Sequence, residues 1–125
     1  MKEELKNIEA FPDYYVSDMG NFYSTRVSRK HNPKGNLYKL TLWDKHPSGY
    51  LNAGLYNKPG VKNKTYFRAH RLIWETFMGP IPKGMDVDHK NNNKKDNRLE
   101  NLQLLTRKEN TLKWHQIDKP KRNDT

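Results

Sequence analysis

The sequence contains no cysteine, and this absence excludes both a disulfide framework and a zinc site built from thiolates. It also lacks any run approaching the ~18 consecutive apolar residues that a membrane-spanning helix needs. Hydrophobic residues make up only 33% of the 125 positions, and charged residues make up 30%. These shortages predict one small domain with a thin core that is stabilised by packing or by a hard metal ion.

The start of the chain has no apolar stretch that could serve as a secretory signal, since its first six residues are Met-Lys-Glu-Glu-Leu-Lys. A basic chain could also bind a membrane surface, but no long cationic amphipathic helix is visible in the sequence. We therefore expect a cytoplasmic protein with no membrane partner.

Acidic residues are scarce relative to basic ones. Only 14 Asp and Glu residues oppose 24 Lys and Arg residues, and the formal net charge is +10. The excess is uneven: residues 1–60 carry 9 basic and 6 acidic side chains, a net of +3, whereas residues 61–125 carry 15 and 8, a net of +7. This balance favours a polyanion as the partner, and it concentrates the attraction in the second half.

The first half of the chain has the composition of short β-strands. Aromatic and β-branched residues flank a turn in residues 14–24, which predicts a hairpin there, and Gly20 can adopt the positive φ that such a turn requires. Residues 28–36 are polar, basic and interrupted by proline and glycine, so we expect a surface loop. Three further strand candidates would complete a small antiparallel sheet: residues 37–43, 50–56 and 65–67.

The second half changes from a helical pattern to a strand pattern and back. Residues 69–77 place apolar side chains on one helical face, and a Gly-Pro pair follows the last of them. Residues 85–89 and 102–105 have the composition of two strands joined by a polar loop. Residues 106–109 then have the form of a capping box, so a second helix is expected to begin there. The predicted fold class is α+β, with a covering helix on a small antiparallel sheet followed by a strand, strand, helix unit.

Four polar residues of this second half have the chemistry that phosphodiester hydrolysis requires. Asp88 and His89 lie at the end of one predicted strand, and Asn101 opens the next. Asn110 lies on the helix that follows. Carboxylate and amide oxygens are ligands for a hard cation such as Mg²⁺, and a histidine with a reference pKa near ~6.5 can be neutral and accept a proton from water. The four residues together predict one metal ion beside one general base.

The adjacency of Asp88 and His89 raises a geometric difficulty. Neighbours on a regular strand point to opposite faces, so the two side chains cannot both face one atom if the strand is ideal. We expect Asp88 to face the helix and hold the metal with Asn110, while His89 reaches the far side of the scissile phosphate, provided that the strand twists or ends there. The alternative interpretation of the pair is an exposed polar strand end without catalytic function.

These residues resemble a known family. The sequences Val87-Asp88-His89, Glu100-Asn101-Leu102 and Lys108-Glu109-Asn110, with the asparagine-rich loop between them, look like the HNH motif of phage-type HNH homing endonucleases in the His-Me finger (ββα-metal) superfamily. Residues 70–77 are similar to the helix that precedes this motif in the family. Residues 15–21 resemble its N-terminal YxVSNxG module, so the resemblance spans most of the chain.

The resemblance implies a role for each motif residue. His89 would be the general base, Asp88 and Asn110 would bind one Mg²⁺ or Mn²⁺ ion, and Asn101 would orient the histidine and steady the loop. It further implies double-stranded DNA as the substrate, products with a 3′-hydroxyl and a 5′-phosphate, and a bacterial or phage-infected host cell as the setting. The chain departs from many relatives because no helical DNA-binding repeats and no zinc-binding cysteines accompany the motif, so recognition of a long target site is not implied.

Other residues have both a functional and an ordinary interpretation. His70 could contact phosphate, but at the start of a helix we expect a structural hydrogen bond. Trp43 and Tyr50, with most other aromatic residues, are expected in the core. Seven basic residues could neutralise DNA phosphates, or could be ordinary solvated charges. These DNA-binding candidates are Arg71, Lys90, Lys94, Lys95, Arg98, Arg29 and Lys30.

The predicted organisation has three parts. Residues 1–68 form an antiparallel β module that contributes to DNA binding, residues 69–116 form the HNH ββα-metal nuclease unit with its lead-in helix, and residues 117–125 form a flexible basic tail. The predicted function is a divalent-metal-dependent DNA endonuclease; one site breaks one strand, so a duplex break needs two copies, and monomer and homodimer both stay open. The alternatives are a non-catalytic DNA-binding protein that retains the HNH shell, or a nucleic-acid chaperone driven by charge alone.

Overall fold

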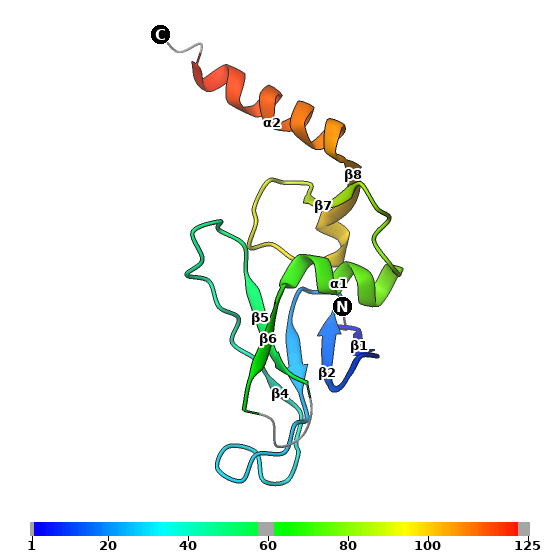
Figure 1. The fold of residues 1–125 in the computed structure, drawn as a ribbon, viewed down its shortest axis with the longest axis vertical. Coiled ribbons are helices and arrows are strands. Elements are labelled where there is room, and N and C mark those ends of the chain that lie inside the picture. The colour runs from blue at the N-terminus through cyan, green and yellow to red at the C-terminus, as the bar shows by residue number, and fades with distance from the viewer. Residues whose placement is uncertain (1, 58–61, 123–125) are drawn as a thin grey trace.

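The computed structural model describes residues 2–57 and 62–122, with side chains described as far as Gln116. Its first half contains a four-stranded antiparallel sheet in the order β1-β2-β3-β4. Two of these strands, β1 and β2, lie against the helix α1 (Ala69–Met78) (Figure 1). The expected hairpin over residues 14–24 is confirmed by the pairing of β2 with β3. The four strands are β1 (Leu5–Ile8), β2 (Phe11–Ser17), β3 (Phe22–Ser24) and β4 (Tyr38–Lys39).

Two separate hairpins and two α-helices complete the structure, so the fold is α+β as predicted. One hairpin pairs β5 (Asn52–Tyr56) with β6 (Lys64–Arg68). The other pairs β7 with β8, and a single 3₁₀ turn precedes β8. The helix α1 follows β6 directly, and α2 follows β8 directly. The bounds are α1 (Ala69–Met78), β7 (Met85–His89), the 3₁₀ turn (Leu99–Asn101), β8 (Leu102–Thr106) and α2 (Arg107–Arg122).

The sheet differs from the prediction in two places. Residues 37–43 do not form one strand beside residues 50–56: β4 pairs with β3, and only Trp43 reaches β5, through a pair of backbone hydrogen bonds with Asn52. The strand β1 was not predicted because only Ile8 of its four residues is buried, which leaves no alternation of apolar and polar residues to detect.

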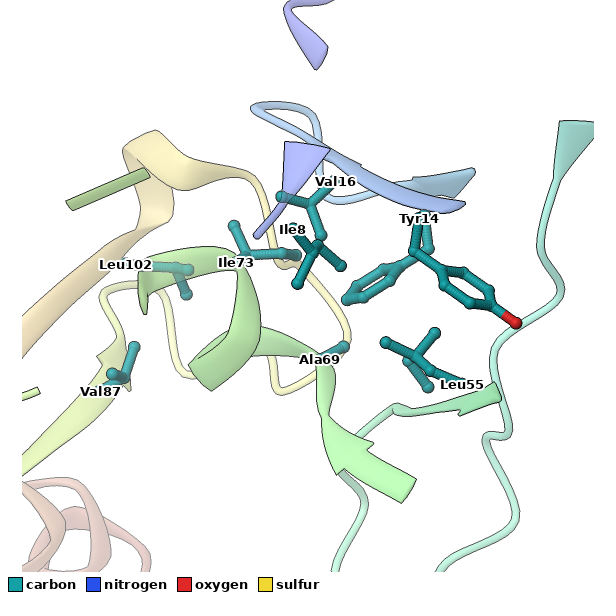
Figure 2. Packing of buried hydrophobic residues seen from close by; sticks show 10 residues of the cluster. Ile8, Tyr14, Val16, Leu55, Ala69, Ile73, Val87 and Leu102 are labelled. Carbon is teal, nitrogen blue, oxygen red and sulfur yellow. The ribbon is translucent and has the colours of Figure 1, made fainter. Parts of the chain in front are cut away.

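The core is a single cluster that joins the two halves of the chain around α1 (Figure 2). Val16 and Phe22 come from the four-stranded sheet and Leu55 from β5, and all three are fully buried. Ile73 of α1 is fully buried with them, and α1 contacts β1, β2, β6 and β7. Burial of each such side chain contributes about 1.5–3 kcal/mol to the stability of the fold. Because α1 packs against strands of both halves, it is the element through which the first sheet supports the β7–β8 hairpin.

The ends of α1 follow the predicted helix closely. The first amide of the helix, on Ala69, donates to the Leu51 carbonyl. The N-cap residue Arg68 makes no capping hydrogen bond with its side chain. At its end Gly79 has a φ of 103° and donates its amide to the Glu75 carbonyl, which terminates the helix where the Gly-Pro pair was expected to stop it.

Two further expectations concern the surface and the C-terminal segment. Trp43 was expected in the core, but 47% of its surface is exposed. The helix α2 continues to Arg122, although a flexible tail was expected from residue 117, and residues 123–125 lie outside the described part. The division of the chain at residue 68 stays a prediction. Among the described residues, no helix combines the length and the apolar character needed to cross a bilayer.

Candidate active site

The β7–β8 hairpin and the first turn of α2 bring three of the four predicted site residues, Asp88, His89 and Asn110, to one small cavity of about 20 Å³. Asp88 and His89 are the last two residues of β7. The predicted capping box then starts α2: the Thr106 amide donates to a Glu109 carboxylate oxygen at 2.8 Å, and the Glu109 amide donates to the Thr106 hydroxyl at 3.1 Å. This fixed start places Asn110 in the first turn of α2, where it lines the cavity together with Asp88 and His89.

Asp88 and His89 are adjacent on β7, where they pair with Gln103 and Leu102 of β8. Beyond His89 the chain leaves β7 in a tight turn, in which the Asn92 amide donates to the His89 carbonyl at 2.9 Å and Asn92 adopts a positive φ of 65°. The two side chains have different partners, Asp88 on β8 and α2 and His89 in the loop, and both residues line the cavity. Asp88 also faces α2, as expected.

The imidazole of His89 is held by a hydrogen bond at one ring nitrogen and by packing against another aromatic ring. Its Nε2 lies 2.7 Å from Oδ1 of Asn97, and in this orientation of the amide the oxygen accepts a proton from Nε2, which leaves the lone pair on Nδ1. The ring of His70 packs against it with centroids 4.9 Å apart, and Tyr50 stacks on His70 at 4.8 Å. Burial lowers the pKa of His89 below its usual 6.5, against smaller opposing contributions from Asn97 and Asp88. The side chain is therefore neutral at pH 7 and able to accept a proton.

His70 differs from its expected role as a hydrogen-bonding residue at a helix start. It is 5% exposed, and its ring packs against both Tyr50 and His89, whose own ring centroids lie 6.1 Å apart, so the three rings form one triangular cluster. Burial first, and then the nearby His89, Arg71 and Arg68, lower its pKa to about 3. A neutral ring at this position closes one side of the His89 imidazole against water.

Asn101 stabilises the loop between β7 and β8 and does not contact the imidazole directly. Its Nδ2 donates to Oδ1 of Asn91 at 3.0 Å and to the Asp96 carbonyl at 2.9 Å, while its Oδ1 accepts from the Asn91 amide at 3.2 Å. The hydrogen bond to the His89 ring comes from Asn97, so an orienting role of Asn101 would act through the loop and stays a prediction. The hydrogen bonds of Asn101 lie within the loop and agree with the expected role of steadying it.

Asp88 and Asn110 have different surroundings, and both fit a hard cation. Asp88 accepts from Nε2 of Gln103 at 2.9 Å and from Nζ of Lys113 at 2.5 Å, so a positive charge already lies against its carboxylate. Asn110 Nδ2 lies 3.5 Å from Asp86, but Oδ1 of Asn110 is buried and has no hydrogen-bond partner among the described residues. A buried amide oxygen without a donor costs about 1–3 kcal/mol, and a metal ion would satisfy it.

The donor set is sparse for a metal site. Within residues 2–57 and 62–122, no group of three His, Cys, Asp or Glu side chains could surround an ion. A site with one carboxylate and one amide oxygen matches Mg²⁺, which keeps several waters and completes its shell with substrate phosphate. The residues present therefore fit a substrate-assisted site and do not fit a cage formed by protein alone.

The predicted DNA-binding residues fall into three groups. Lys90 and Lys95 are exposed on the loop beside the cavity, and Arg71 is half-buried on α1. Lys94 donates to the Ser48 carbonyl at 2.8 Å and lies over the Tyr50 ring, at the cavity wall.

The other candidates are paired or distant. Arg98 is held by Asp96 at 2.8 Å and by Glu100 at 2.6 Å, so its charge is already partly neutralised. Arg29 and Lys30 are exposed on the loop of residues 28–36, which lies at the opposite end of the molecule from α2 (Figure 1). Of the seven candidates, Lys94 lines the cavity and Lys90 and Lys95 are exposed on the adjoining loop, and their contact with DNA phosphates stays a prediction.

Comparison with known proteins agrees with this geometry. Residues 67–112, which include every residue of the predicted HNH motif, match the family model described as HNH endonuclease. This chain is a relative of the phage-type HNH homing endonucleases. It is 35% identical to the DNA endonuclease I-HmuI of Bacillus phage SP01 over 109 residues, which cover 86% of this chain and 55% of that protein.

Two further comparisons extend the relationship. YosQ, from the SPbeta prophage of Bacillus subtilis (strain 168), is 44% identical over 66 residues, which cover 53% of this chain and 37% of YosQ. The solved structure of I-HmuI, described as showing DNA binding and cleavage, superimposes with a TM-score of 0.72 at 29% identity, over 92% of this chain and 59% of that one. The chain thus spans about a third to a little over half of these HNH relatives.

Three residues of the site were missed in the sequence. Tyr50 was assigned to the core, although it lines the cavity. Asn97 was assigned mainly to loop architecture, because asparagine is common in turns. Lys113 lies three residues after Asn110 on α2, and this i, i+3 spacing was the available signal that both residues share one helix face, from which Lys113 reaches Asp88.

Proposed function

We propose that this chain is a divalent-metal-dependent DNA endonuclease that hydrolyses phosphodiester bonds. The observation that carries the proposal is the convergence of Asp88, His89 and the unpartnered Oδ1 of Asn110 on one cavity. A neutral imidazole beside two oxygen ligands is the equipment of metal-assisted hydrolysis. The likeness to I-HmuI, a named DNA endonuclease, supports DNA as the substrate.

The residues have distinct tasks in this proposal. His89 takes a proton from the attacking water at Nδ1, since Nε2 is occupied by Asn97. Asp88 and Asn110 would hold one Mg²⁺ or Mn²⁺ ion, which when bound stabilises the negative charge that develops on the leaving oxygen. Loss of the 3′ oxygen as the leaving group gives a 3′-hydroxyl and a 5′-phosphate.

The basic surface supplies the remaining binding energy. The net charge of +10 and the exposed Lys90 and Lys95 beside the cavity favour contact with phosphates. One cavity contains one general base, so a single copy nicks one strand. A duplex break would require a second copy or a second binding event.

A plasmid assay tests this proposal directly. Supercoiled plasmid incubated with the purified protein should be converted to the nicked form with Mg²⁺ or Mn²⁺ and should stay supercoiled with a chelator. His89→Ala prepared in the same way is the control for contaminating nuclease. Absence of metal-dependent nicking across a range of pH and both metals, with DNA binding retained, would refute the proposal.

The second candidate is a non-catalytic DNA-binding protein, and the contact of Lys113 with Asp88 favours it. An ammonium group at 2.5 Å from the carboxylate neutralises the charge that a metal ion would use. If the ion cannot displace Lys113, the cavity stays without metal and the protein only binds DNA. Measured binding of Mn²⁺ to the wild-type protein separates the two candidates before any cleavage is assayed.

A further inference from the structure

The contact of Asn97 with His89 is of a different kind from the other asparagine contacts of this structure. Asn97 is 3% exposed, and its Oδ1 accepts from the imidazole at 2.7 Å. Its Nδ2 is buried and has no hydrogen-bond partner within the described residues. By contrast, the buried Asn32 and Asn101 use both ends of their amides to bind backbone or side chains of their own loops. The Asn97 side chain therefore supplies a hydrogen-bond acceptor to the imidazole, while its own Nδ2 makes no hydrogen bond within the described residues.

The backbone at Asn97 is held by the turn between β2 and β3, in the first half of the chain. The Leu99 amide donates to the Asp18 carbonyl at 2.8 Å. A Cβ atom at Gly20 would lie 2.9 Å from the Asn97 carbonyl carbon and 3.1 Å from its oxygen, so the two backbones meet without space for a side chain. The φ of Gly20 is +88°, which further restricts this position to glycine.

We propose that Asn97 is the positioning residue of His89, and that the turn at Asp18–Gly20 is the brace that holds Asn97 in place. By accepting from Nε2, Asn97 selects the tautomer in which Nδ1 faces the cavity with a free lone pair. The N-terminal β module therefore has a second task besides any contact with DNA, which is to complete the geometry of the general base. The catalytic part of this inference rests on the proposed endonuclease function.

The alternative is that Asn97 only stabilises the loop, and three variants distinguish the two roles. Asn97→Ala removes the acceptor, Asn97→Asp keeps an acceptor and adds a charge, and Asn93→Ala alters an exposed asparagine of the same loop. For Asn97→Ala we expect kcat to fall by about 10- to 100-fold while KM for DNA changes by less than about twofold, as for loss of a positioning contact. Asn97→Asp should recover much of kcat and should move the pH midpoint of kcat upward, because a carboxylate favours the protonated imidazole. Asn93→Ala should behave as wild type.

A spectroscopic readout makes the positioning role independent of cleavage. In metal-free wild-type protein at pH 7.5, the ¹⁵N shifts of His89 should show Nε2 protonated and Nδ1 unprotonated. In Asn97→Ala both tautomers should be present. An Nδ1-protonated ring in the wild type, or an unchanged ring in Asn97→Ala, would overturn the positioning role even if the protein is an active nuclease. Absence of cleavage in the wild type with the expected ¹⁵N pattern would instead refute the endonuclease function alone.

The brace is tested with two glycine variants that have matched backbone conformations. Gly20→Ala and Gly84→Ala both force an alanine into positive φ, at +88° and +85°, but a Cβ at Gly84 meets nothing within 4 Å. We expect Gly20→Ala to lower kcat about tenfold or more and to mix the His89 tautomers, at an unchanged Kd for DNA. Gly84→Ala should lose only the stability that the positive φ costs, and should keep both the kcat and the ¹⁵N pattern of the wild type. Equal His89 signals in the two variants would show that the turn is not a brace.

Discussion

The burial of His70 against His89 makes the stability of the protein depend on pH in a definite direction. The pKa of His70 is about 3 in the folded protein, and that of an unfolded chain is near ~6.5. Below pH 6.5 the unfolded state binds a proton that the folded state does not, so the stability contributed by neutral His70 is complete above pH 6.5 and is lost as pH falls toward 3. Each pH unit within this window costs about 1.4 kcal/mol, so acidification from pH 6.5 to 5.0 should cost about 2 kcal/mol.

The experiment compares the wild type with His70→Phe, which keeps a flat ring beside Tyr50 and removes the titration. Urea unfolding followed by tryptophan fluorescence, with chelator present, gives the midpoint at each pH. For an m-value near ~2 kcal/mol/M, the wild-type midpoint should fall by about 1 M between pH 6.5 and 5.0. His89, whose pKa is also lowered, contributes in the same direction, so the variant should retain a smaller fall.

Two features keep this comparison interpretable. Asp96, whose pKa is about 2 because Arg98 and Asn91 hold its carboxylate, is ionised in both the folded and the unfolded state between pH 6.5 and 5.0 and adds little slope over that interval. Any strain from the larger phenylalanine ring lowers the midpoint by the same amount at every pH. Equal falls in the wild type and His70→Phe would refute the reasoning, because they would show that His70 is accessible to protons in the folded state.

The remaining predictions concern cleavage and metal binding. His89→Ala should lower metal-dependent nicking at least about 100-fold with little change in the Kd for DNA; a parallel loss of binding would make the residue structural. The nicking rate of the wild type should rise with pH through a midpoint below 6.5, because burial lowers the pKa of His89; a midpoint above 6.5 would contradict this. Asn110→Ala should weaken Mn²⁺ binding about tenfold, as measured by electron paramagnetic resonance, and an unchanged affinity would remove the residue from the metal site. Lys113→Met should strengthen Mn²⁺ binding about five- to tenfold, since a competing ion pair worth about 1 kcal/mol is lost; weaker binding would show that Lys113 supports the site.

The sequence predicted well those elements whose signals come from residues close together in the chain. The helical spacing of apolar residues located α1, and the capping box of Thr106 and Glu109 located the start of α2 to within one residue. The same box, with the strand before it, was enough to place Asn110 beside Asp88 and His89. Each of these inferences needed only residues close together in the chain.

Features that depend on distant segments were not predictable in the same way. Tyr50 reaches the cavity because the β5–β6 hairpin packs beside α1, and nothing in its neighbours distinguishes it from a core aromatic residue. Asn97 and Asn101 are both loop asparagines, and only the three-dimensional fold decides which one meets His89. The brace at Gly20 joins positions almost eighty residues apart, so a glycine in a turn was all that could be read there.

The direct passage from β8 into α2 limits how this protein can change. Thr106 ends the strand and Arg107 begins the helix, so no spare residue separates them. A helix advances by about 100° per residue, and one inserted residue at this junction would turn Asn110 about a quarter of the way around the helix and away from the cavity. Related chains should therefore tolerate changes of length in the surface loop of residues 28–36. They should keep a constant number of residues between the end of β8 and Asn110.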